Sequence, residues 1–130
     1  MKKSETFSNF SNGVLAVPNA TKKFCDIPWT PHPAFEGVEL KHLITAADTN
    51  GQFSYHLVKI DPNKSILNHI HDKQLETHEV IMGSGTCINA GQNSPYAPGT
   101  VSIIAAGVEH EVVAGDDGLY LFAKFFPALS

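Results

Sequence analysis

Residues 69–83 read HIHDKQLETHEVIMG and carry the most informative pattern in the chain. His69 and His71 are two positions apart, and side chains with that spacing project to the same face of a β-strand. Both imidazoles can therefore reach one metal ion. If residues 72–75 form a loop, the Glu76 carboxylate returns to the same point at the start of the next strand and adds an oxygen ligand.

A fourth ligand has to come from another part of the chain. His110 follows Gly107, where a turn can direct the imidazole inward. Three imidazoles and one carboxylate leave up to two positions open on an octahedral Fe, Mn, Ni or Co ion, whereas Zn favours a closed tetrahedron. The sequence therefore predicts one divalent transition metal ion (Fe, Mn, Ni, Co or Zn) and does not decide which.

Short apolar or alternating runs fill the rest of the chain, with turn signals between them and no long helical periodicity. This pattern is typical of an antiparallel all-β sandwich or barrel. Strands are predicted at 38–45, 53–60, 66–71, 76–82, 86–88, 92–96, 101–104, 110–113 and 119–126, with sharp turns at 83–85 and 115–118. Such a number of short strands suits a jelly-roll barrel, which limits exposed sheet edges.

The N-terminal part of the chain does not share this strand pattern. Residues 1–12 are expected to be a loose tail, and the prolines between Gly13 and Gly37 exclude a helix interior or a central strand. The predicted organisation is thus a tail and Pro-rich arm over 1–37 and a barrel domain over 38–130.

Composition narrows the possible partners and the compartment. The 130 residues are 42% hydrophobic and 17% charged, as in an ordinary globular domain, and the net charge of −4 comes without a basic cluster that would bind nucleic acid. No apolar run is long enough to span a membrane or to act as a secretory signal, which predicts a cytoplasmic protein. Cys25 and Cys87 are expected to be reduced packing residues rather than a disulfide.

With these residues the chain resembles the cupins, a superfamily of small barrels with two metal-binding motifs. Residues 69–83 match the first motif (His-x-His, four spacers, Glu, six spacers, Gly), although Asn63 replaces its leading Gly. Residues 99–110 match the second (Gly, five spacers, Pro-x-Gly, two spacers, His), with Ala105 in place of Pro; Ala114 also stands where Asn is usual. The resemblance covers roughly residues 38–127. It implies a double-stranded β-helix, often a homodimer, that holds a small-molecule ligand or substrate.

Further histidines leave their roles open. His78 shares a strand face with Glu76 and is the predicted catalytic residue, since its imidazole can transfer protons near neutral pH; it can equally hydrogen-bond a metal ligand or be a buried residue satisfied by the backbone. His42 lies on an apolar face, either in a pocket or in the core. Tyr55 and His56 project to opposite faces of one strand, so at most one of them faces inward.

Three functions follow from this combination. The first is a metal-dependent enzyme of dioxygenase, isomerase or lyase type, in which the ion polarises a small organic substrate or binds dioxygen. The alternative is a non-catalytic barrel that binds or senses a small molecule with the same metal site. In the third, the metal ion is structural and only stabilises the barrel.

Overall fold

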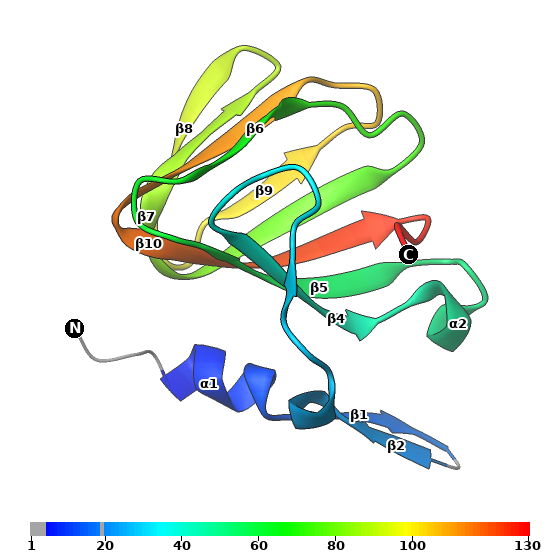
Figure 1. Cartoon of the computed structure of the whole chain (residues 1–130). Coiled ribbons are helices and arrows are strands. Elements are labelled where there is room, and N and C mark those ends of the chain that lie inside the picture. The colour runs from blue at the N-terminus through cyan, green and yellow to red at the C-terminus, as the bar shows by residue number, and fades with distance from the viewer. Residues whose placement is uncertain (1–4, 19) are drawn as a thin grey trace.

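A single antiparallel sheet of eight strands curls into a barrel in the computed structural model, which describes residues 5–18 and 20–130 (Figure 1). In chain order the elements are α1 (Glu5–Ser11), β1 (Val14–Val17), β2 (Ala20–Lys23), η1 (Phe24–Asp26), β3 (Thr30–Pro31), β4 (Val38–Ile44), α2 (Ala46–Thr49), β5 (Ser54–Ile60), β6 (Ser65–His69), β7 (Leu75–Asn89), β8 (Gln92–Tyr96), β9 (Val101–Ile104) and β10 (His110–Phe126). The order of paired strands is β3-β4-β5-β10-β7-β8, with β6 paired to β10 and β9 paired to β7. The prediction of an all-β jelly-roll barrel is confirmed.

Two long strands, β7 and β10, replace four of the predicted short ones. They pair along most of their length, with shifts in register between Ala114 and Leu119 and between Tyr120 and Leu121. The prediction of sharp reversals at 83–85 and 115–118 is therefore wrong. Instead, the two paired strands approach each other closely here, and a Cβ atom at Gly83 would overlap the Gly118 carbonyl.

The N-terminal arm is more ordered than the sequence suggested. Residues 5–11 form α1, and the β1–β2 hairpin follows it; both lie against the barrel (Figure 1). The loose-tail prediction is wrong for residues 5–12, and its remaining part, residues 1–4, lies outside the described residues. Phe7 explains the difference, since its ring is buried against Tyr120, with ring centroids 4.8 Å apart, and stacks on Trp29.

A buried lysine fixes the arm in place. The Lys41 ammonium on β4 donates hydrogen bonds to the Ser11 carbonyl at 2.7 Å and to the Phe24 carbonyl at 2.6 Å. Each carbonyl belongs to the arm, so one charged group ties two of its segments to the barrel wall. Hydrogen bonds from a charged donor are stronger than neutral ones.

The apolar core is divided between the inside and the outside of the barrel. The inner cluster comprises Val38, Val58, Ile60, Val80, Cys87, Tyr96, Val112, Ala114, Leu119, Leu121, Ala123 and Phe125. A second cluster of Phe7, Phe24, Leu43 and Leu57 joins the arm to the outer face of the sheet. Both cysteines are free thiols; Cys87 is buried as expected, but Cys25 is exposed, so the packing prediction is wrong for Cys25.

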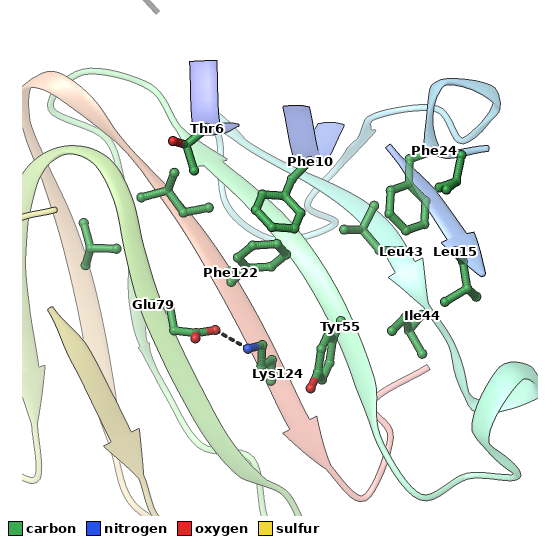
Figure 2. A pocket seen from close by; sticks show the side chains of 13 residues that line it. Thr6, Phe10, Leu15, Phe24, Leu43, Ile44, Tyr55, Glu79, Phe122 and Lys124 are labelled. Carbon is green, nitrogen blue, oxygen red and sulfur yellow. Dashed lines mark ion pairs between the residues drawn. The ribbon is translucent and has the colours of Figure 1, made fainter. Parts of the chain in front are cut away.

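A hollow of about 590 Å³ remains between the arm and the outer face of the sheet. Figure 2 shows Phe10 of α1 next to Phe122 of β10, with the two rings in edge-to-face contact, and an ion pair between Glu79 and Lys124. The other lining residues are largely apolar. Among the described residues, no helix is long and apolar enough to cross a membrane.

We predict that Gly83→Ala destabilises the barrel far more than Gly91→Ala. Both glycines have a positive φ, 88° and 79°, so alanine is strained at either position by about 1 kcal/mol. Only Gly83 also abuts backbone, whereas nothing lies within 4 Å of a Cβ at Gly91. We expect urea unfolding to give a loss at least about 2 kcal/mol larger for Gly83→Ala. Equal losses would show that β7 and β10 do not approach each other closely at Gly83.

Candidate metal centre

Strand pairing brings the predicted ligands together. His69 is the last residue of β6, Glu76 lies at the start of β7, and His110 is the first residue of β10. Because β10 pairs with β6, His110 lies directly opposite His69. His71 lies beyond the end of β6, where the Gly107 N–H donates a 2.9 Å hydrogen bond to its carbonyl and ties the two loops together.

The three imidazoles lie close together, and the Glu76 carboxylate contacts two of them. The ligating nitrogens of His69, His71 and His110 lie within 4.8 Å of one another, and the Nε2 atoms of His69 and His71 are 3.1 Å apart. Glu76 Oε1 is 3.2 Å from His110 Nε2 and 3.7 Å from His71 Nε2. Ligands about 2.1 Å from a common ion are separated by roughly these distances.

The orientation of the rings fits a metal ion. The Nδ1 atoms of His69 and His110 donate to the Leu67 and Val108 carbonyls at 2.8 and 3.0 Å. These bonds fix the tautomer in which each Nε2 carries a lone pair directed to the common point. Within the described part of the chain, His110 Nε2 and Glu76 Oε1 are buried without any hydrogen-bond partner. Because buried polar atoms are rarely left unpaired, this donor set fits a bound cation.

Burial and neighbouring charges shift the pKa values of all four side chains. Burial lowers the pKa of His69 and of His71, which keeps both imidazoles neutral at pH 7. Burial alone would raise the pKa of Glu76, but the adjacent His78 and His110 outweigh it and hold this pKa well below its usual range. Burial lowers the pKa of His110, but Glu76 and the Val108 carbonyl together raise it more, so this pKa lies above its ordinary value. The centre thus holds an ionised carboxylate among imidazoles.

His78 contacts Oε2, the second oxygen of the Glu76 carboxylate. Its Nε2 lies 2.6 Å from Glu76 Oε2 and its Nδ1 lies 2.9 Å from the Tyr96 hydroxyl, and the ring is almost fully buried. Both ring nitrogens are therefore engaged, as in a residue that orients a metal ligand. The catalytic role of His78 stays a prediction.

Two further histidines line the cavity: the sequence left the direction of His56 open and gave His32 no role at the site. His56 faces the cavity with its Nε2 2.8 Å from Ser54 Oγ and its Nδ1 2.7 Å from His42 Nδ1. Burial and the neighbouring His42 lower the pKa of His56 to about 4. His32 reaches the same cavity from the arm. Alternation along β5 offers a signal for His56, but only the tertiary fold reveals His32.

His42 itself is paired with His56 and is absent from the residues that line the cavity. The cavity beside the four ligands is small, about 60 Å³, and its remaining walls are mainly aliphatic and aromatic. This is roughly the space that two water molecules occupy in the liquid.

Comparison with known proteins supports the fold. No protein-family model matches the sequence, and no curated protein matches it. Among solved structures, a predicted oxalate decarboxylase from Thermotoga maritima is 21% identical over 79% of this chain and 95% of that one, with a TM-score of 0.72. KdgF from Halomonas sp. is 18% identical over 77% and 86%, with a TM-score of 0.67.

A third solved structure, an RmlC-like cupin from Shewanella frigidimarina, is 17% identical over 81% of this chain and 87% of that one, with a TM-score of 0.70. At these identities the likeness concerns architecture, which agrees with the two motifs and with the barrel described above. The chain therefore has the fold of these solved structures, a cupin-type barrel.

Proposed function

We propose that this chain is a metal-dependent enzyme that acts on a small organic substrate inside the barrel. The observation that carries the proposal is the buried pair His110 Nε2 and Glu76 Oε1, which lie 3.2 Å apart without a hydrogen bond and next to two further imidazoles. A bound ion would supply Lewis-acid chemistry, with dioxygenase, isomerase or lyase reactions as the candidates. One neighbour by structure is described as a predicted oxalate decarboxylase.

The surrounding residues would position the ligands and exclude water. The contact from His78 fixes the Glu76 carboxylate, and the Tyr96 hydroxyl fixes His78 in turn. Burial raises the pKa of Tyr96 far above its usual range, so the hydroxyl keeps its proton. Phe125 packs against the rings of His56 and His71 and gives the cavity an apolar wall.

The alternative is a barrel that binds or senses a small molecule without turnover. One observation favours it: both nitrogens of His78 and both nitrogens of His56 are already hydrogen-bonded. Neither ring is then free to exchange a proton with a substrate unless a contact opens. The two functions share the metal centre and differ in whether the bound molecule is converted.

We also propose that the chain forms a homodimer through the outer face of the sheet. Val101 and Ile103 project from β9 with 66% and 67% of their surface exposed. Val101 is paired with Glu79, which lines the hollow under the arm (Figure 2). An apolar ridge and an apolar hollow thus share one face, which a twofold-related copy can match with its own hollow and ridge.

The first prediction concerns metal uptake. We expect His69→Ala and His71→Ala each to weaken binding of Co(II) by more than about 100-fold, since each removes a ligand. His42→Ala is the matched control, because His42 does not line the cavity, and its metal content should equal that of the wild type. Metal content is measured by elemental analysis after anaerobic loading and dialysis. Full uptake by both ligand variants would refute the centre.

The second prediction separates the enzyme from the binding module. A glutamine at position 78 can still donate to Glu76 but cannot act as an acid or base, so His78→Gln should retain the metal and lose at least about 100-fold in turnover. Turnover is followed by NMR of small carbonyl and carboxylate compounds incubated with the metal-loaded protein. Compounds that bind the wild type and are never consumed would support the binding module instead.

The third prediction concerns assembly. The double variant Val101→Lys, Ile103→Lys should be monomeric in sedimentation analysis at micromolar concentrations where the wild type is a dimer. Leu67→Lys is the control, since Leu67 is also exposed (56%) but does not line the hollow. A monomeric wild type, or a double variant that still dimerises, would contradict this interface.

A further inference from the structure

Fixed positive charge is missing from the described walls of the metal cavity. The chain contains nine basic residues, all of them lysines, and none of the described lysines lines the cavity. Arginine forks and lysine ammonium groups are the usual partners of carboxylate and phosphate groups in binding sites. Here the lining consists of His32, His56, His69, His71, His78, His110, Glu76 and apolar residues.

The imidazoles do not replace that missing charge. Burial lowers the pKa of His32, and His56, whose pKa lies near 4, is neutral at pH 7. Both nitrogens of His78 and both nitrogens of His56 already contact protein groups, so neither ring offers a free donor to an anion. The described walls thus bring one carboxylate, Glu76, and no lysine that could pair with an anionic ligand.

A charge count then limits the ligand. A divalent ion and the Glu76 carboxylate together leave one net positive charge in the cavity. One anionic group on the ligand neutralises it, whereas a second would be buried without a partner. Burial of an unpaired charge is strongly unfavourable in an interior of low dielectric constant.

We propose that the cavity selects small ligands that bear one negative charge and an apolar body, and discriminates against dianions. The apolar body would pack against the cavity walls formed by Val58, Ile66 and Phe125. The cavity volume of about 60 Å³ restricts the buried part of the ligand to a few heavy atoms. This inference rests on the proposed function in one respect, the presence of a divalent ion at the four ligands.

Pyruvate and oxalate provide a matched pair of probes. Both offer two adjacent oxygens to a metal, and they differ by a methyl group in place of a charged oxygen. Each probe is titrated into Co(II)-loaded protein, and binding is followed by the absorption of the ion. The affinities are compared with those of the same probes for free Co(II) in the same buffer. We expect the preference for oxalate over pyruvate to fall at least tenfold in the protein relative to the free ion.

Removal of the ion by oxalate without a ternary complex also supports the proposal, because the dianion then binds the metal only outside the cavity. An unchanged or increased preference for oxalate would overturn it. Metal content measured before the titration keeps the two claims apart, since failure to load Co(II) refutes the metal centre, whereas full loading with no discrimination refutes only the ligand class.

A charge added to the cavity wall should reverse the selectivity. Ile66 lines the cavity on β6, whereas its neighbour Leu67 is exposed and outside it. We expect Ile66→Arg to raise the affinity for oxalate relative to pyruvate at least tenfold and Leu67→Arg to leave the ratio unchanged. If Ile66→Arg does not fold, the wild-type titration still decides the proposal. A folded Ile66→Arg protein with the wild-type ratio would contradict it.

Discussion

The curling of the sheet, which brings β6, β10 and the start of β7 together, is the constraint on which the metal centre depends. The β6–β10 pairing sets His110 opposite His69, whereas the β7–β10 pairing sets Glu76 opposite Phe125, so Glu76 meets His110 across the barrel at 3.2 Å. His69 and His110 are more than forty positions apart in the chain and meet because their strands are paired. The β7–β10 ladder also requires glycine at position 83, where a Cβ atom would overlap the Gly118 carbonyl.

Convergence of these side chains has an energetic cost that a cation would remove. A buried polar atom without a partner destabilises a protein by about 1–3 kcal/mol, and more when it is charged. Glu76 Oε1 and His110 Nε2 are in this situation, while the other polar atoms of the same side chains are satisfied by His78 and by the Val108 carbonyl. The protein thus directs rigidly held donors at a point where only a positive charge completes the set. Such preorganisation is typical of sites that bind metal ions.

Sequence spacing predicted which side chains lie close together because the relevant geometry is local. Two histidines two positions apart on a strand, a short loop and a carboxylate suffice to describe three of the four ligands. The departures from the usual motifs are also explicable: Asn63 adopts a positive φ of 62°, a conformation that asparagine tolerates better than most residues, so it can replace glycine there. The fold class followed from alternation and turn residues in the same way.

Tertiary packing decided what the sequence did not reveal. Helix α1 has only seven residues and depends on Phe7 against Tyr120 rather than on its own propensity, so its sequence resembled a tail. The glycines of β7 and β10 resembled turns because a close approach of two paired strands and a chain reversal both require small residues. His32 and Tyr96 reach the centre only through the curvature of the barrel, which no spacing in the chain records.

The central claim is that His69, His71, Glu76 and His110 surround a single ion. Anomalous diffraction from crystals of Co(II)-loaded protein, recorded at the cobalt absorption edge, tests it most directly. The account predicts one strong peak per chain about 2.0–2.2 Å from three imidazole nitrogens and one Glu76 oxygen. A peak elsewhere on the protein, or no peak among these four side chains in a fully loaded crystal, would contradict it.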